Sequence, residues 1–165
     1  MNHHLYYHIL WSTRGQRRLI NRDAAAFLDR VLRTIATEER TQVIAMGLVR
    51  THVHLLVRAH PMTAIPRLLQ RLKGASSALA GRELHLPAEQ QLHWAPGYTI
   101  HTVSPSALAR VRDYVRSQAA RHPREAIKGW EGNTADPGEE EAPAGRIGDE
   151  MGCLERMKRL GPDLN

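Results

Sequence analysis

The amino-acid sequence predicts an α+β domain whose strands and helices follow one another in the order βαββαβα. Three observations support this prediction: hydrophobic periodicity alternates between strand-like and helix-like in that order, turn or cap residues separate the segments, and no segment repeats another. This order is the ferredoxin-like pattern, a four-stranded antiparallel sheet with its helices on one face. The other face, or one edge of the sheet, would then stay open for a partner.

The first half of the pattern predicts a strand, a helix and a hairpin. Residues 4–11 form a continuous run of large side chains, which suits a strand covered on both faces. Residues 23–40 place apolar side chains along one helical stripe. Residues 42–49 and 52–58 are rich in β-branched and aliphatic residues, so we expect two strands that pair as a hairpin.

The second half predicts a helix, a strand and a last helix. Thr63 opens the second helix, which tolerates Pro66 in its first turn. Residues 98–103 form the fourth strand. Ser104-Pro105 is an N-cap followed by proline at the first helical position, and it starts a third helix that ends at His122-Pro123.

The chain divides into two parts of unlike charge. Residues 1–122 carry 17 Lys and Arg against 7 Asp and Glu and hold all ten histidines, whereas residues 123–165 carry 6 against 10. The second part is also rich in Gly and Pro, a composition that buries little apolar surface. We therefore predict a functional domain over residues 1–122 and an acidic tail over residues 123–165, with a short helix near residues 147–160.

Length and composition exclude several classes of protein. A chain of 165 residues, 42% hydrophobic, suits one compact domain. No apolar run approaches the roughly 20 residues that span a bilayer, and the start of the chain lacks the regions of a signal peptide, so we expect a cytoplasmic protein without a membrane partner. The single cysteine, Cys153, leaves histidine, carboxylate or amide groups to hold any metal.

The basic residues favour a polyanionic partner. The net charge is +6, and 20 of the 23 basic residues are arginines. The planar guanidinium matches phosphate with two parallel hydrogen bonds, so nucleic acid is the partner that this composition favours. A genome rich in G and C would raise the arginine count as well, so charge alone leaves both explanations open.

His52-Val53-His54 is the sharpest chemical feature of the sequence. Alternate side chains of a strand share a face, so the two imidazoles lie side by side while Val53 points to the other face. This spacing permits a two-point chelate of a metal ion, although such pairs also occur on surfaces and in cores. A metal site therefore needs a third ligand from elsewhere in the chain.

Tyr114 and Gln118 lie four residues apart on the third predicted helix and so share one helical face. They fall on the shoulder of its apolar stripe, where a helix borders a cleft against a sheet. Alone they would be a half-buried tyrosine and a solvated glutamine. Beside two histidines they supply an amide oxygen for a metal and a phenol that can act as a nucleophile.

Four motifs then follow one another along residues 4–122, after an opening strand and basic turn at Tyr7-His8-Ile9-Leu10-Trp11-Ser12-Thr13-Arg14. They are His52-Val53-His54-Leu55-Leu56-Val57, Leu72-Lys73-Gly74-Ala75-Ser76-Ser77, Trp94-Ala95-Pro96-Gly97-Tyr98-Thr99-Ile100-His101-Thr102-Val103-Ser104 and Tyr114-Val115-Arg116-Ser117-Gln118. In this order they resemble the single-tyrosine HUH transposases of small bacterial insertion sequences, relatives of the REP-associated tyrosine transposases. The resemblance implies the HUH endonuclease type of the predicted fold, with His52, His54 and Gln118 as metal ligands and Tyr114 as nucleophile.

The same resemblance implies a metal-dependent transposase that cleaves and rejoins single-stranded DNA at hairpin-bearing element ends through a 5′-phosphotyrosine intermediate. It also implies Mg²⁺ or Mn²⁺ and a homodimer. No nucleotide cofactor is expected, and the sequence has no Gly-rich phosphate-binding motif. Arg50-Thr51 stand where family members usually have Pro-Asp, a departure that removes a carboxylate next to His52. The candidates for phosphate contacts are Arg14, Arg17, Arg18, Arg67, Arg71 and Lys73.

Two other functions remain as alternatives. The first is a domesticated relative that binds DNA hairpins without transposition, against which the complete set of His52, His54, Tyr114 and Gln118 argues. The second is a ferredoxin-like RNA-binding domain, a class that stacks bases on aromatic strand residues. The one phenylalanine of the chain, Phe27, lies on a predicted helix, which disfavours that class.

Overall fold

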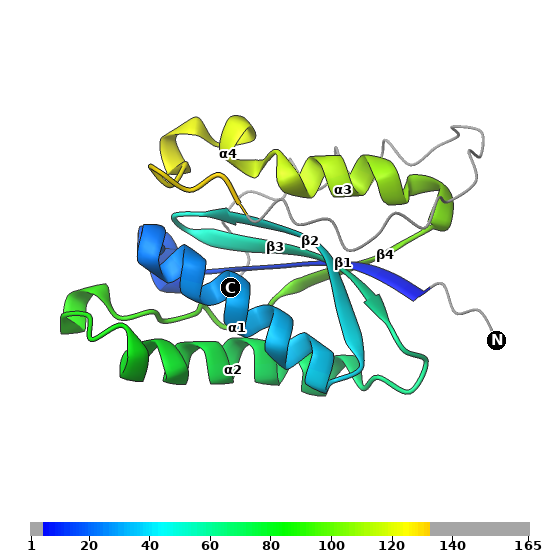
Figure 1. Ribbon diagram of the computed structural model, residues 1–165, viewed down its shortest axis with the longest axis horizontal. Helices are drawn as coiled ribbons and strands as arrows, with labels where there is room; N and C mark the ends of the chain where they lie inside the picture. The colour runs from blue at the N-terminus through cyan, green and yellow to red at the C-terminus, as the bar shows by residue number, and fades with distance from the viewer. Residues whose placement is uncertain (1–4, 133–165) are drawn as a thin grey trace.

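The computed structural model describes residues 5–132, and its elements follow the predicted order (Figure 1). The sheet has the strand order β2-β3-β1-β4, and each neighbouring pair is antiparallel. The predicted ferredoxin-like fold class is therefore confirmed. The helix predicted near residues 147–160 lies outside the described residues. The strands are β1 (Leu5–Ser12), β2 (Thr41–Val49), β3 (His52–Ala59) and β4 (Thr99–Val103).

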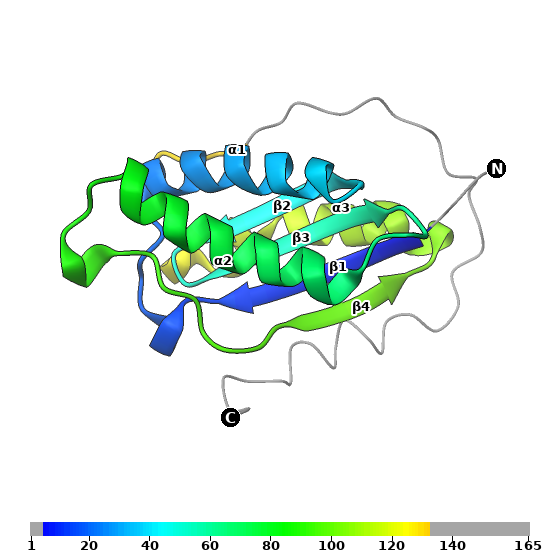
Figure 2. The same ribbon diagram turned by 90° about the horizontal axis from the view of Figure 1, so that it is seen from below.

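Helices lie on both faces of this sheet. α1 (Arg22–Glu38) and α2 (Ile65–Glu83) run side by side over one face (Figure 2). α3 (Leu108–Arg116) and the short α4 (Gln118–Arg121) lie on the other (Figure 1). The prediction that the helices share one face is thus correct for α1 and α2 and wrong for α3.

The reason is that the second face of the sheet is also apolar. Tyr6, Ala45 and Leu56 line it, and Val111 and Val115 of α3 pack on them in a small core of their own. The larger core lies between the first face and the helices α1 and α2. Burying apolar surface is favourable on either face, so the last helix covers strands that would otherwise expose it.

No helix within residues 5–132 has the length and apolarity that crossing a membrane requires. Short turns of 3₁₀ helix connect the main elements. These turns are η1 (Arg14–Gln16), η2 (Ala88–Gln90), η3 (Pro105–Ala107) and η4 (Pro123–Glu125).

The third predicted helix is interrupted at Ser117, which has φ −89° and ψ 13° and separates α3 from α4. Its hydroxyl donates a hydrogen bond to the carbonyl oxygen of Tyr114 at 3.1 Å. The Nε2 of Gln118 donates to the same oxygen at 2.9 Å. Side-chain hydrogen bonds of this kind compete with the backbone bonds that continue a helix, which accounts for the interruption.

Packing continues past the predicted domain boundary at residue 122. Ile127 is buried in the larger core, and Trp130 packs against that core. The amide of Arg50 donates to the carbonyl oxygen of Glu125 at 2.8 Å. Residue 122 therefore marks the change in charge along the chain, whereas the packed fold continues to Trp130.

Gly47 of β2 gives the first testable prediction. A Cβ at this position would lie 2.1 Å from the carbonyl oxygen of Val115 and 2.7 Å from the Cγ of Gln118, and a backbone oxygen cannot move aside cheaply. Gly47→Ala should therefore lower the free energy of unfolding by about 1–3 kcal/mol, measured by urea denaturation.

Gly74, inside α2, is the matched control. A Cβ there would meet nothing within 4 Å. Because alanine favours a helix over glycine, Gly74→Ala should raise the free energy of unfolding by about 0.5–1 kcal/mol. Equal effects of the two substitutions would show that α3 and α4 do not press on β2 at Gly47.

Candidate active site

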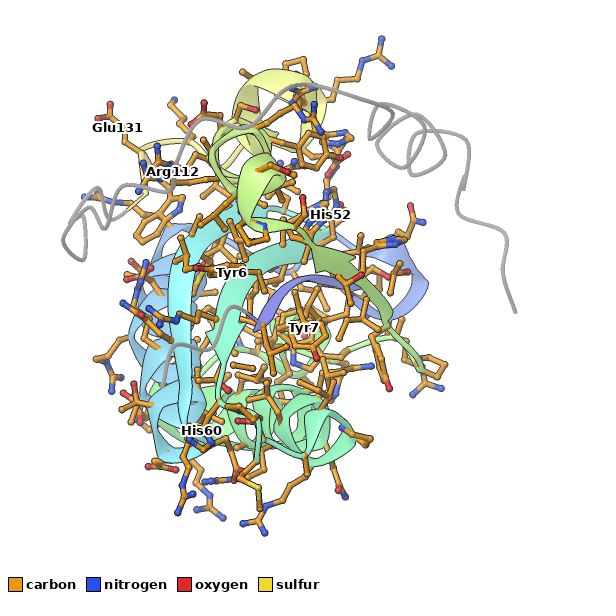
Figure 3. All side chains as sticks on the ribbon, turned by 90° about the vertical axis from the view of Figure 1, so that its right-hand side faces the viewer. Tyr6, Tyr7, His52, His60, Arg112 and Glu131 are labelled. Atoms are coloured by element: carbon orange, nitrogen blue, oxygen red, sulfur yellow. The ribbon has the colours of Figure 1, made fainter. Side chains whose placement is uncertain are left out.

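His52 and His54 project from β3 toward α3 and α4. In the sheet register His54 lies between Gly47 of β2 and Leu10 of β1, while Val53 packs into the core on the opposite face. The two imidazole centroids are 5.1 Å apart, with 67° between the ring planes. Figure 3 shows His52 on the side of the sheet that carries α3 and α4. The two imidazoles therefore share a face, as the spacing predicts.

Tyr114 and Gln118 reach the same place from the helices. The Tyr114 ring stands edge-on to His54, with 5.9 Å between centroids and 76° between planes. Gln118 is 1% exposed, and its Oε1 is buried without a hydrogen-bond partner among the described residues. The structure thus brings together the four residues predicted for metal binding and nucleophilic attack.

His8 of β1 belongs to this cluster, and the sequence analysis missed it. Its Nε2 lies 2.9 Å from the Nδ1 of His54, and the two rings stack with 5.1 Å between centroids. Its centroid is also 5.8 Å from that of the Tyr114 ring. Contact between His8 and His54 depends on the register of β1 against β3, which places His8 opposite Leu56. No local pattern in the sequence carries that register.

The Nδ1 atoms of both predicted metal ligands are engaged in hydrogen bonds. His8 occupies the Nδ1 of His54, and the Oγ1 of Thr51 lies 3.0 Å from the Nδ1 of His52. The Nε2 of each ring is therefore the nitrogen that remains for a metal ion. Such hydrogen bonds orient metal-binding histidines. Thr51 takes the place next to His52 where the resemblance leads one to expect an aspartate.

Burial keeps these imidazoles neutral at pH 7. It is the largest cause that lowers the pKa of His8 and of His52 to about 4, and the pKa of His54 well below its ordinary value. Neighbouring histidines add to the effect, among them His122, whose ring centroid is 5.1 Å from that of His52, whereas the charge of Glu125 and the side chain of Gln118 act in the opposite direction on the pKa of His52. A neutral imidazole offers the lone pair that a metal ion requires.

These donors fit a divalent metal ion. Two neutral imidazole nitrogens and one buried, unpartnered amide oxygen point to a site with three protein ligands, which leaves positions for substrate oxygens. Within residues 5–132 no group of three or more His, Cys, Asp or Glu side chains is placed to hold a metal. A third protein ligand would therefore be a group of another type, and the amide of Gln118 is the candidate that the sequence predicts.

Arg67 and Arg71, two of the predicted phosphate contacts, lie on α2 and thus on the opposite face from His52. Arg71 forms ion pairs of 2.6 Å with Glu38 and 2.7 Å with Glu39, and Arg67 pairs with Glu39 at 3.3 Å. The sheet lies between α2, which carries both arginines, and the α3–α4 segment (Figure 1).

Lys73, a third predicted phosphate contact, holds the loop before β4. Its ammonium donates to the carbonyl oxygens of Ala95 and Gly97. The indole of Trp94 donates to the hydroxyl of Ser76 at 3.0 Å, so two of the sequence motifs contact each other. These contacts give Lys73 a structural function.

Arg14, Arg17 and Arg18 follow β1, whose last residue pairs with His52, so they lie at the same end of the sheet as the site. Arg18 forms an ion pair of 3.0 Å with Glu125. Arg17 donates to the carbonyl oxygen of Glu89 at 2.7 Å. All three guanidinium-bearing residues are exposed. Of the predicted phosphate contacts, these three follow the strand end that pairs with His52.

The hydroxyl of Thr51 gives a second prediction. Thr51→Val keeps the shape of the side chain but removes the hydrogen bond that orients His52. The affinity for Mn²⁺ should fall about 10- to 100-fold, measured by the rise in melting temperature as Mn²⁺ is titrated into the protein. Thr102→Val on the exposed side of β4 is the control and should leave the affinity unchanged. Equal affinities of all three proteins would exclude Thr51 as an orienting group.

The chain is similar in sequence to known proteins. Residues 1–118 match the model of the transposase IS200-like family, Y1_Tnp. The ISDra2 transposase TnpA of Deinococcus radiodurans is 35% identical over 117 residues, which cover 69% of this chain and 84% of that protein.

Two solved structures are similar as well. A crystal structure from Deinococcus radiodurans R1, provisionally described as a transposase, is 30% identical with a TM-score of 0.57, covering 72% of this chain and 93% of that one. A REP-associated tyrosine transposase bound to a REP hairpin shares the fold, with a TM-score of 0.56 at 11% identity, covering 74% of this chain and 70% of that one. By sequence and by fold, this chain belongs to the IS200-like transposase family.

Proposed function

We propose that this transposase cleaves and rejoins single-stranded DNA through Tyr114, with a divalent metal ion held by His52, His54 and Gln118. One observation carries the proposal. The Tyr114 ring stands edge-on to the imidazole of His54, whose ring centroid is 5.1 Å from that of His52, and the buried amide oxygen of Gln118 has no hydrogen-bond partner among the described residues. An unsatisfied buried acceptor costs about 1–3 kcal/mol, and a bound metal ion would give the Oε1 of Gln118 the partner that it lacks.

The chemistry follows from the phenol. Its Oη forms a bond to phosphorus while the bond from phosphorus to the 3′-oxygen breaks. The phenol gives up one proton and the departing 3′-oxygen gains one. Bound Mg²⁺ or Mn²⁺ would neutralise a non-bridging oxygen of the phosphodiester. One phosphate ester replaces another, so the reverse reaction can rejoin a strand without a nucleotide cofactor.

A DNA hairpin is the proposed substrate. The REP-associated relative was solved with a REP hairpin, which supports the same class of ligand for this chain. Arg14, Arg17 and Arg18 lie at the end of the sheet that holds His52 and supply positive charge for a DNA backbone there. The homodimer that the resemblance implies stays a prediction.

Covalent capture of DNA tests this function. The protein is incubated with a library of single-stranded hairpin oligonucleotides and Mn²⁺, and products are separated on denaturing gels. We expect a covalent protein–DNA species that requires the metal, and Tyr114→Phe should abolish it because phenylalanine lacks the attacking oxygen. Tyr7→Phe is the matched control, since Tyr7 packs against the core on the α1 and α2 face and should not affect the yield.

The other outcomes are equally informative. The same yield from wild type and Tyr114→Phe would exclude Tyr114 as the nucleophile. Hairpin binding by the wild type without any covalent species, at every metal concentration, would favour the domesticated binding protein. The first outcome contradicts the role of Tyr114, and the second contradicts strand cleavage itself, so the two results are distinguishable.

A further inference from the structure

Arg121 of α4 lies against the Tyr114 ring. The guanidinium carbon is 4.6 Å from the ring centroid, within the range of a cation–π interaction. The two residues are seven positions apart, about two helical turns, so they share one side of the helical segment. The Arg121 side chain is otherwise exposed to solvent.

Ser117 fixes the guanidinium in this place. The Nε of Arg121 donates to the Oγ of Ser117 at 2.9 Å. The same Oγ donates to the carbonyl oxygen of Tyr114 at 3.1 Å. A short hydrogen-bonded chain thus runs from Arg121 through Ser117 to Tyr114, across the interruption between α3 and α4.

The charge of Arg121 is not cancelled by this partner. Ser117 is neutral, whereas Arg18, at the same end of the sheet, is paired with the carboxylate of Glu125 at 3.0 Å. The Nε–H is used by Ser117, and the terminal NH₂ groups are the part of a guanidinium that binds phosphate oxygens as a fork.

We propose that Arg121 is a second cationic group at the reacting phosphate, which holds the Tyr114 ring by its face and binds a non-bridging oxygen of the phosphodiester under attack. This inference rests on the proposed nucleophilic role of Tyr114. A guanidinium placed in advance stabilises the charge that develops on the phosphoryl oxygens, and it orients the phenol toward phosphorus.

The rate of adduct formation is the first test. A hairpin oligonucleotide selected by covalent capture is mixed with excess protein and saturating Mn²⁺, and adduct is followed in a single turnover. Arg121→Gln should slow the reaction about 100-fold, the usual effect of removing one donor to a developing oxyanion. Arg121→Lys should recover part of the rate. Arg124→Gln removes the same charge three residues away and should react like the wild type.

The second test needs no activity. In a Tyr114→Phe background and with EDTA present, binding of the same fluorescein-labelled oligonucleotide is measured by anisotropy at several salt concentrations. The logarithm of the binding constant falls linearly as the logarithm of the salt concentration rises. Loss of one phosphate contact should make this dependence less steep by about 0.7 for Arg121→Gln, and Arg124→Gln should leave it unchanged. A purely structural role would lower the melting temperature without changing that slope, and would overturn the inference.

The two levels of the proposal fail separately. If the wild type forms no adduct, the nucleophilic function of Tyr114 is wrong. If the wild type forms adduct and Arg121→Gln does so at the same rate with the same salt slope, the function stands and the assignment of Arg121 is wrong.

Discussion

The close contact between strand β2 and the α3–α4 segment at Gly47 is the constraint on which the site depends. Because Gly47 has no side chain, the carbonyl oxygen of Val115 and the side chain of Gln118 lie directly against the sheet. Gly47 is also the register partner of His54. The contact that holds the last helix on the sheet therefore places Gln118 beside the histidine strand, and Tyr114 one turn earlier above the same imidazoles.

The two faces of the sheet differ in how apolar their cores are. The α1 and α2 face carries the larger apolar core, while the α3 face carries a small core interrupted by His8, His54 and Gln118. Burying polar groups costs free energy unless they are hydrogen-bonded, and the contacts of His8 with His54 and of Thr51 with His52 offset part of that cost. The Oε1 of Gln118 is one of the buried polar atoms that have no hydrogen-bond partner among residues 5–132, so it is available to a ligand.

Local patterns predicted the elements and two pairs of site residues. Strand alternation determines that His52 and His54 share a face, and helical periodicity brings Tyr114 near Gln118. Contacts between elements were not predictable, because the pairing of His8 with His54 depends on strand register. The interruption at Ser117 was also missed, since two side chains compete there for one carbonyl, an effect that periodicity does not describe. The helix on the second face was misplaced because a run of large residues in β1 does not tell which element covers it.

The arginine count of the sequence likewise does not tell which arginines lie near the candidate site. Arg67 and Arg71 are paired with Glu38 and Glu39, yet ion pairs close to the surface contribute little to stability, and a DNA phosphate can displace them. Pairing therefore does not decide which arginines serve the reaction. Position is more informative, because α2 and α3 lie on opposite faces of the sheet (Figure 1), so the sheet separates a guanidinium on α2 from the phosphate that Tyr114 is proposed to attack. Net charge predicts a polyanionic partner, and the topology of the sheet assigns the charges that meet its reacting group.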